Sequence, residues 1–229
     1  MLVLWRLWAP FFFVGSLLVS LTGCASRSSA LGETFSALWS YGSSDKPLAA
    51  LDMRYRYIRI QVAGQPAAIY ALAFIDNDSS GEIETWFSGN REVVKTQNGR
   101  IVGTAGLKVD WTRVIYPVAP PDWGKVQSAS IKYIREHDAV PGYAFGVKEE
   151  LTVQALSEVP ANRLPETMPL DTAKSYKWFQ EGSNTRSGVA LPTQLFALGL
   201  HRGGQTIVYS EQCLQPDFCM KLQRWPVLP

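Results

Sequence analysis

The sequence Glu84–Leu107, ETWFSGNREVVKTQNGRIVGTAGL, decides the fold of the chain. Asn98-Gly99 is a dipeptide favoured in two-residue type I′ turns, because both central residues of that turn need a positive φ. Such a turn places these residues opposite one another across a hairpin: Thr96 and Ile101, Val94 and Gly103, Lys95 and Val102, Gln97 and Arg100. The first two pairs form a small apolar face, and the other two form a mixed to polar face. Gly103 and Gly106 have low strand propensity and therefore indicate a bulge or a close backbone approach.

Strand patterns continue on the N-terminal side of this hairpin. From Met53 the side chains alternate with period two, and residues 67–75 are nearly all apolar, which is typical of a strand buried on both faces. Residues 76–81 are polar and predict a loop before the strand Glu82–Ser88. Together these segments predict an antiparallel meander of about five strands.

A proline-rich connector, VAPPDWG at Val118–Gly124, separates this meander from a second β-rich part. Five further strands are predicted after it: Val126–Arg135, Tyr143–Leu156, Tyr176–Gln180, Val189–Leu200 and Thr206–Glu211. We expect a surface loop at Val159–Pro169 and a hairpin turn at Gly203-Gly204. The predicted fold is mainly β: antiparallel meander sheets that form a curved sheet, a sandwich or an open barrel. It spans residues 31–229 as one domain, which the connector could divide into halves at 31–117 and 118–229.

The N-terminal segment is a targeting sequence. Residues 1–23 have one positive charge, at Arg6, followed by an apolar run, and their length and flanks fit a secretory signal better than a spanning helix. Leu21-Thr22-Gly23-Cys24 resembles the lipobox of bacterial lipoproteins, which implies that Cys24 carries lipid and holds the chain to a membrane. Ala25 follows, and the resemblance implies sorting to the outer membrane. Residues 24–30 then form a polar tether, and residues 32–41 a short amphipathic helix.

The two remaining cysteines, Cys213 and Cys219, enclose a short turn-forming loop in what we expect to be an oxidising compartment. We predict a structural disulfide that links the C-terminal hairpin. A metal site would need more ligands than His137 and His201, the only histidines, and redox catalysis favours two intervening residues rather than five.

No catalytic constellation is recognisable. The chain has no G-x-S-x-G motif, and His137 is predicted to be a polar loop residue. The carboxylates of Glu149-Glu150 and of Glu82 and Glu84 are predicted to lie on solvated strand faces. Residues 76–81 match the first half of a calcium loop, but Phe87 replaces the bidentate glutamate, so a solvated turn is favoured. We therefore expect no enzymatic activity, metal or cofactor, and the net charge of +2 does not favour binding to nucleic acid.

Tryptophans could either fill the core or stack on sugar rings, and we favour the core for most of them. After removal of the signal sequence six remain: Trp39, Trp86, Trp111, Trp123, Trp178 and Trp225. Trp123, in the connector, is the one we expect to be exposed.

The order of an apolar strand, a polar turn, a tryptophan-bearing strand and the opening hairpin is similar to that of the YjbF/GfcB family of lipoproteins. The resemblance covers residues 47 to 115 and rests on these residues: Trp86, Val94, Thr96, Gly99, Arg100, Ile101, Val102, Thr104, Gly106 and Leu107. Members of the family are encoded with genes for secretion of exopolysaccharide or group 4 capsule, beside an outer-membrane β-barrel protein.

The resemblance implies a non-enzymatic accessory lipoprotein at the periplasmic face of the outer membrane. It would assist assembly or export of a polysaccharide by contacting a β-barrel partner or the glycan itself, with Trp123, Trp86 and Arg100 as contact residues. Two alternatives remain open: a polysaccharide-modifying enzyme with paired carboxylates, and a purely structural envelope protein.

Overall fold

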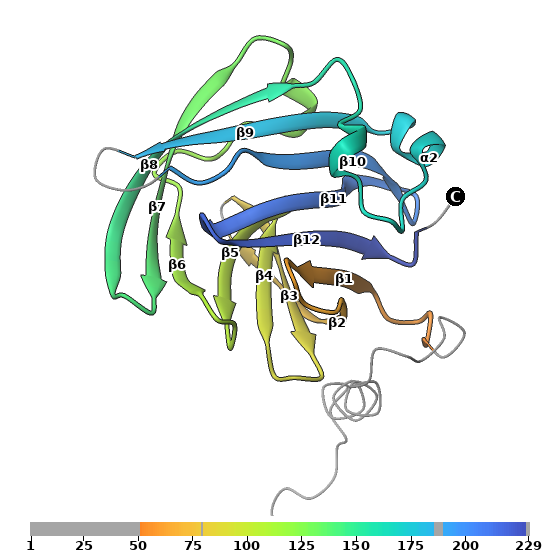
Figure 1. Ribbon diagram of the computed structural model, residues 1–229, viewed down its shortest axis with the longest axis horizontal. Helices are drawn as coiled ribbons and strands as arrows, with labels where there is room; N and C mark the ends of the chain where they lie inside the picture. The colour runs from red at the N-terminus through yellow and green to blue at the C-terminus, as the bar shows by residue number, and fades with distance from the viewer. Residues whose placement is uncertain (1–50, 79, 186–189, 228–229) are drawn as a thin grey trace, which may run out of the picture.

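The computed structural model describes residues 51–78, 80–185 and 190–227 of the 229-residue chain. They form a single sheet of twelve strands (Figure 1) in the order β5-β4-β3-β2-β1-β12-β11-β10-β9-β8-β7-β6. The strands are β1 (Tyr57–Val62), β2 (Ala68–Asp78), β3 (Gly81–Ser88), β4 (Val93–Gln97), β5 (Arg100–Ala105), β6 (Asp110–Ile115), β7 (Ile131–Val140), β8 (Ala144–Ala155), β9 (Lys177–Thr185), β10 (Gln194–His201), β11 (Gly204–Gln215) and β12 (Phe218–Trp225). Three short helical segments lie between strands: η2 (Trp123–Lys125), η3 (Ala161–Arg163) and α2 (Leu170–Lys174).

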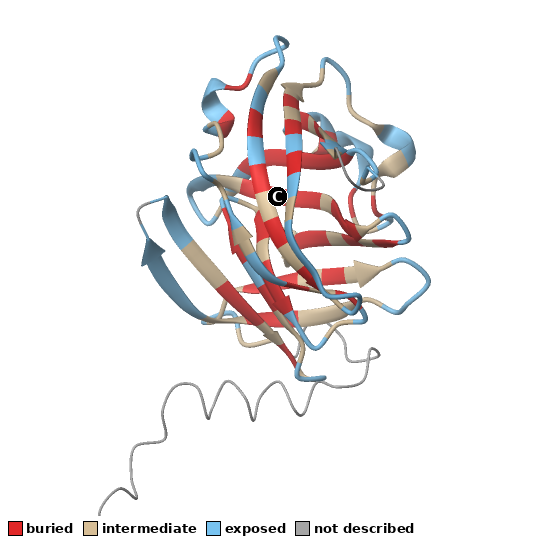
Figure 2. Ribbon diagram, turned by 90° about the vertical axis from the view of Figure 1, so that its left-hand side faces the viewer, coloured by how far each residue is buried: buried red, intermediate tan, exposed pale blue. Residues whose placement is uncertain are grey.

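The sheet is an antiparallel meander that closes on itself almost completely. The first strand, β1, pairs with the last, β12, so the two edges of the described sheet are β5 and β6. These two strands are consecutive in the chain and are joined only by residues 106–109. The sheet therefore curls into a barrel with one seam between β5 and β6, and the strands on both sides of the connector belong to the same wall (Figures 1 and 2). Of the predicted architectures, the open barrel is confirmed.

The hairpin turn at Asn98-Gly99 is confirmed. Both residues have a positive φ, 50° for Asn98 and 78° for Gly99, as a type I′ turn requires. Gly99 is needed for a second reason, because a Cβ atom there would lie 2.4 Å from Cβ of Ile207 on β11. The turn therefore packs directly against the opposite wall of the barrel.

The predicted register is correct only next to the turn. Gln97 faces Arg100 and Thr96 faces Ile101, but the ladder then shifts at a bulge, so that Lys95 faces Gly103 rather than Val102. Val94 consequently faces Thr104 instead of Gly103. The glycines indicate that a bulge occurs, but its position depends on how the strand bends around the barrel.

Apolar side chains fill the interior along most of the wall. One cluster lies against β1, β3, β4 and β12 and includes Ile58, Trp86, Val94 and Met220. A second cluster, around Trp123, joins the connector to β8–β11. Buried residues alternate with exposed ones along the strands, as Figure 2 shows, because successive side chains point to opposite faces of a sheet.

Other predictions differ from the structure in detail. The end of β2 is not buried on both faces, since Phe74 and Ile75 are exposed where the strand extends to the tip of its hairpin. The turn between β10 and β11 uses Arg202-Gly203, one residue earlier than predicted. The five strands predicted before the connector are confirmed as β1–β5, but a sixth strand there, β6, was not predicted.

The predicted disulfide between Cys213 and Cys219 is confirmed, and it links β11 to β12. The lipobox at Cys24, the tether over residues 24–30 and the expected helix over residues 32–41 lie outside the described residues. Within the described residues, no helix combines the length and the apolar character needed to cross a bilayer.

Candidate functional site

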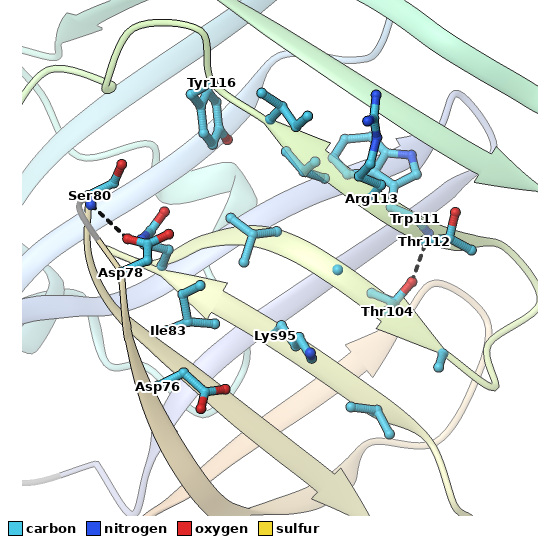
Figure 3. A pocket seen from close by; sticks show the side chains of 17 residues that line it. Asp76, Asp78, Ser80, Ile83, Lys95, Thr104, Trp111, Thr112, Arg113 and Tyr116 are labelled. Carbon is cyan, nitrogen blue, oxygen red and sulfur yellow. Dashed lines mark hydrogen bonds between the residues drawn. The ribbon is translucent and has the colours of Figure 1, made fainter.

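A groove of about 660 Å³ runs along the outer side of the seam (Figure 3). Its walls come from both edge strands and from the adjoining strands of the meander. The lining residues are Asp76, Asp78, Ser80, Ile83, Val93, Lys95, Gln97, Val102, Gly103, Thr104, Ala105, Trp111, Thr112, Arg113, Val114, Ile115 and Tyr116.

The groove exists because side chains, rather than a backbone ladder, hold the seam together. Among the described strands, no registered pairing joins β5 to β6. Instead, the backbone N–H of Trp111 donates to the hydroxyl oxygen of Thr104, at 2.9 Å. The carboxylate of Asp110 accepts hydrogen bonds from the backbone N–H groups of Gly106 and Leu107 in the connecting turn. Bulges on both sides of the seam keep the strands from forming a regular ladder there.

The groove presents charged, amide and small apolar groups side by side. Asp78 accepts a hydrogen bond from the side-chain amide of Gln97, at 2.8 Å. Arg113 is held by two ion pairs, at 3.0 Å to Glu136 and at 2.9 Å to Asp138. The exposed Lys95 lies between these groups (Figure 3). Donors and acceptors close together on an open surface suit a ligand rich in hydroxyl groups.

The buried Trp111 connects the groove to the barrel interior. Its ring stacks on His137, with a centroid distance of 4.4 Å. The guanidinium of Arg135 lies 4.5 Å from the centroid of the same ring. Trp111 therefore separates the outer groove from a layer of buried charges.

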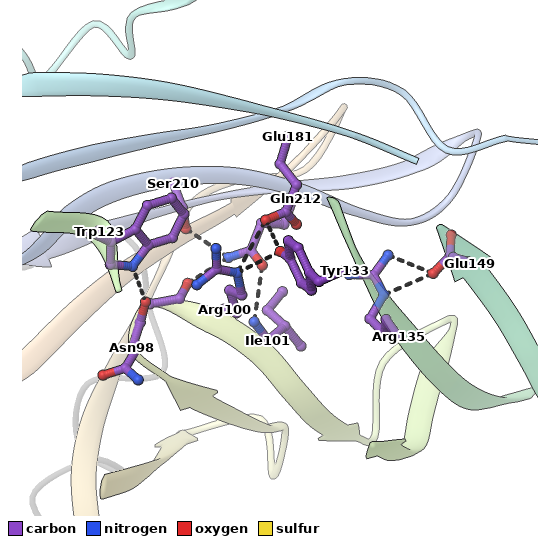
Figure 4. Close-up of polar contacts among 11 residues, drawn as sticks. Asn98, Arg100, Ile101, Trp123, Tyr133, Arg135, Glu149, Glu181, Ser210 and Gln212 are labelled. Carbon is purple, nitrogen blue, oxygen red and sulfur yellow. Dashed lines mark hydrogen bonds and ion pairs between the residues drawn. The ribbon is translucent and has the colours of Figure 1, made fainter. Parts of the chain in front are cut away.

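One centre of buried charge is Arg100 on β5. Its guanidinium donates to the carboxylate of Glu181 on β9, at 3.1 Å, and to the hydroxyl of Tyr133 on β7, at 3.0 Å (Figure 4). The Tyr133 hydroxyl in turn donates to Glu181. The ring of Trp123 covers the guanidinium at 3.9 Å and donates its indole N–H to the carbonyl of Asn98. This arrangement ties the edge strand β5 to the opposite wall, across the interior.

The second centre pairs Arg135 with Glu149, which face each other on β7 and β8. Their closest charged atoms are 2.6 Å apart, and Nδ1 of His137 lies 3.2 Å from the same carboxylate. Burial alone would raise the pKa of Glu149, but the neighbouring His137 and the charge of Arg135 hold that pKa below its usual value. Glu149 therefore stays ionised and fixes the two neighbouring side chains in place.

The residues expected to contact a ligand lie inside the barrel. Trp86, Trp123 and Arg100 are all buried, so none of them presents its ring or guanidinium to a glycan at the surface of this structure. The expectation that Trp123 is exposed is wrong, because η2 turns the connector inward and places the indole against Phe179 and Phe196.

Two predictions about the charged residues of β7 and β8 are also wrong. His137 is buried on β7 rather than part of a polar loop, because the strand continues past its predicted end at Arg135. Glu149 is buried rather than solvated, because it occupies an inward position opposite Arg135. Glu150, at the next, outward position, is exposed as expected.

Sequence reasoning also missed the partners of these residues. Tyr133, Arg135 and Glu181 occupy inward-facing strand positions, next to apolar inward residues such as Leu151 and Val153. A charged residue that alternates in step with the apolar, inward-facing residues of a strand predicts a buried charge. Because a buried charge requires a partner, the same pattern predicts a buried ion pair. Glu84 is similarly paired, with Arg224 at 2.6 Å.

Comparison with known proteins finds a matching family and solved structures of similar fold. The profile of a family described as group 4 capsule polysaccharide lipoprotein gfcB, YjbF, matches residues 44–166. The crystal structure of the hypothetical lipoprotein YmcC from Escherichia coli has a similar fold, with a TM-score of 0.59 at 15% sequence identity. That similarity covers 90% of this chain and 100% of the other. No curated protein sequence matches the chain.

Proposed function

Because the chain belongs to the family of group 4 capsule polysaccharide lipoproteins, we propose that it is a non-enzymatic accessory factor in the assembly or export of an extracellular polysaccharide. It acts from the periplasmic face of the outer membrane, where lipid on Cys24 holds it. The family match over residues 44–166 supports the polysaccharide role, and it includes both edges of the seam and the groove lining.

The groove along the seam is the observation that carries this proposal. It is open, it offers hydroxyl, amide and charged groups, and buried hydrogen bonds and ion pairs support the barrel wall beneath it. A chain of sugars needs such a surface because each sugar adds a few hydrogen bonds and some contact with small apolar patches. We therefore assign the groove as the surface that contacts the glycan during its transfer.

Filling the groove tests this assignment. Ala105 is exposed and lines the groove, so Ala105→Trp places a bulky ring in the ligand path without disturbing the core. In a deletion strain of the native host complemented with this variant, we expect reduced surface polysaccharide at an unchanged level of the protein. The matched control is Ala161→Trp in η3, which is exposed but does not line the groove, and which should restore the polysaccharide fully.

Two outcomes would count against the proposal. Deletion of the gene that leaves the amount and length of surface polysaccharide unchanged removes the polysaccharide role. Full complementation by Ala105→Trp keeps that role but removes the groove from it.

The same proposal includes a membrane anchor and a protein partner. Metabolic labelling with palmitate should mark the wild-type chain and should not mark a Cys24→Ala variant. Copurification of the lipidated protein from outer membranes should retain a β-barrel protein, since a tethered factor that lacks catalytic activity acts through what it contacts. A fatty-acid-free protein, or one that fractionates with the inner membrane, contradicts the location.

One feature of the groove favours a second candidate function, a glycan-cleaving enzyme. Asp76 and Asp78 both line the groove and, being two residues apart on β2, point to the same side, about 7 Å apart by the rise of a strand. Carboxyl groups about 5 to 10 Å apart are used by glycosidases. Release of reducing ends from isolated polysaccharide by the purified protein, abolished by Asp76→Asn or Asp78→Asn, would establish this function in place of the first.

A further inference from the structure

The far end of β2 is a strand edge without a neighbour. The ladder between β1 and β2 reaches the pair Tyr57 and Ala71, and one further backbone bond runs from the N–H of Leu72 to the carbonyl of Arg56. Beyond that point β2 continues over residues 73–78 and pairs with β3 alone among the described strands. Figure 2 shows this end of the β2–β3 hairpin, coloured as exposed, projecting away from the rest of the barrel wall.

The register of the hairpin shows which backbone groups of this edge are open. Asp78 faces Gly81 across the loop between β2 and β3. The two residues that flank a two-residue hairpin loop exchange both backbone hydrogen bonds, and such bonded pairs alternate along the ladder. Asp78 and Asp76 therefore bond to β3, whereas Ile75 and Asn77 turn their N–H and C=O groups to the open side. An open row of this kind is a template for another strand.

The side chains of this segment fit an internal strand better than an edge. Residues 67–75 are nearly all apolar, which is typical of burial on both faces. Where β1 lies alongside, Tyr70 and Ala71 are buried, but Phe74 and Ile75 beyond its end are 41% and 36% exposed. These two consecutive side chains point to opposite faces of the sheet. A further strand beside β2 would therefore cover part of both of them.

Three acidic side chains decide which kind of strand fits. Asp76, Asp78 and Glu82 are exposed, and none of them forms an ion pair within the part of the chain that the structure describes. Asp78 accepts hydrogen bonds only from uncharged donors, the N–H of Ser80 and the amide of Gln97. Opposite charges on paired strands are favourable and like charges are unfavourable. Two copies of this edge would bring their aspartates together, whereas a strand with basic side chains would neutralise them.

We propose that the free edge of β2, residues 73–78, accepts an extended segment of a partner protein as an additional strand, with lysine or arginine side chains at alternate positions opposite Asp76 and Asp78. The backbone groups of Ile75 and Asn77 form the hydrogen bonds to this strand, and the two aspartates select the partner. Because the aspartates also line the groove, the added strand continues its wall beyond β2. The inference goes beyond the proposed function and does not rest on it, since the edge is the same without a polysaccharide role.

Photocross-linking from this edge in the native host tests the proposal. The full-length protein carries p-benzoylphenylalanine in place of Phe74, an exposed aromatic residue of the edge segment. Irradiation of the cells should give one covalent adduct, and mass spectrometry should identify the cross-linked segment of the partner. The same amino acid in place of Tyr143, which is 77% exposed in the turn between β7 and β8, is the control and should not give this adduct.

Variants made in the cross-linking protein separate backbone pairing from side-chain contact. Asn77→Pro removes an N–H on the open side without removing a bond to β3, so the adduct should fall about tenfold. The matched control Asn77→Ala keeps this N–H and should leave the adduct within about twofold of the parent. Asp76→Lys with Asp78→Lys keeps the backbone groups but reverses the charge, and should also lower the adduct about tenfold. Urea denaturation of each variant shows that it is folded.

Each outcome decides the proposal. An adduct with a segment of another protein that carries lysine or arginine at alternate positions, lost with Asn77→Pro and with the charge reversal but kept with Asn77→Ala, supports it. Absence of an adduct, or an adduct that either of the two disruptive changes leaves intact, overturns it. An adduct with a second copy of this chain, or with residues 1–50 of the same chain, also overturns it and identifies a different occupant of the edge.

Discussion

Two junctions close this barrel, and they are built in opposite ways. At the junction of β1 and β12, six registered residue pairs form a backbone ladder, and the interior beside it is largely apolar, with Ile58, Ile60 and Leu222 buried and one partly buried ion pair between Arg224 and Glu84. At the seam of β5 and β6, no such ladder joins the described strands, and the interior beside it contains Arg100, Arg135 and their carboxylate partners. The seam is also where the groove lies.

The two junctions show that a sheet can close into a barrel without a backbone ladder between its two edge strands. Where backbone hydrogen bonds close the wall, the side chains inside are mostly apolar, and the ion pair of Arg224 with Glu84 is only partly buried. Where they do not, long charged side chains reach across the interior and position the edge strand, as Arg100 does for β5. Buried ion pairs add little net stability, but breaking one leaves a buried charge without a partner, so we expect the pair of Arg100 with Glu181 to hold the seam in one geometry.

The largest expected effect comes from breaking the seam. Arg100→Met leaves Glu181 charged, buried and without its cationic partner, so the free energy of unfolding should fall by about 3–5 kcal/mol. The control Arg113→Met removes the two ion pairs that this exposed arginine makes with Glu136 and Asp138, and should cost about 0–1 kcal/mol. Urea denaturation measures both.

A double variant sharpens this prediction. Arg100→Met combined with Glu181→Leu removes both charges and should be more stable than Arg100→Met alone. A single variant that unfolds at the same urea concentration as the wild-type protein would show that the ion pair does not hold the seam.

The next largest effect concerns the turn that leads into β5. Gly99→Ala combines a positive φ with a clash against Ile207, so unfolding should become easier by about 2–4 kcal/mol. Gly64→Ala is the matched control, because Gly64 has a φ of +75° and a Cβ added there would meet no atom within 4 Å. It should cost only about 1 kcal/mol. Equal losses of stability in the two variants, measured by urea denaturation, would mean that contact between the turn and β11 contributes nothing.

The ladder between β11 and β12, next to the β1–β12 junction, should tolerate the loss of its covalent link. Cys213→Ala with Cys219→Ala removes the disulfide between β11 and β12 and should lower the free energy of unfolding by about 2 kcal/mol, since the loop that it closes is short. The fold itself should persist, because the backbone ladder remains. Loss of the near-ultraviolet circular dichroism of the buried aromatic residues in this variant would show that the backbone ladder does not maintain the fold without the disulfide.

The smallest effect is a pH dependence at the β10–β11 turn. Burial and the nearby Arg224, Arg202 and Arg56 lower the pKa of His201 from 6.5 to about 4. Between these values the unfolded chain binds a proton that the folded chain does not, so stability falls as the pH drops from 6.5 towards 4. His201→Gln should make this part of the stability profile flatter, measured by urea denaturation across that range. An unchanged slope would mean that other groups carry the dependence.

Much of the fold is predictable from the sequence, whereas little of the site is. Turn chemistry at Asn98-Gly99 and alternation in β1–β5 depend on neighbouring residues, so both can be recognised without the structure. The groove cannot, because it arises where two bulged edges meet without pairing. The burial of Trp123 and His137 is equally hidden, because it depends on how the connector and β7 pack against distant strands.

By itself, the sequence determined the antiparallel meander, the opening hairpin and the Cys213–Cys219 link, because each follows from residues close together in the chain. Only the tertiary structure decided that Arg100 meets Glu181, 81 residues away, and that the break in the wall falls between β5 and β6. Alternation along a strand shows which side chains point inward, whereas the curvature of the whole sheet decides which of them meet.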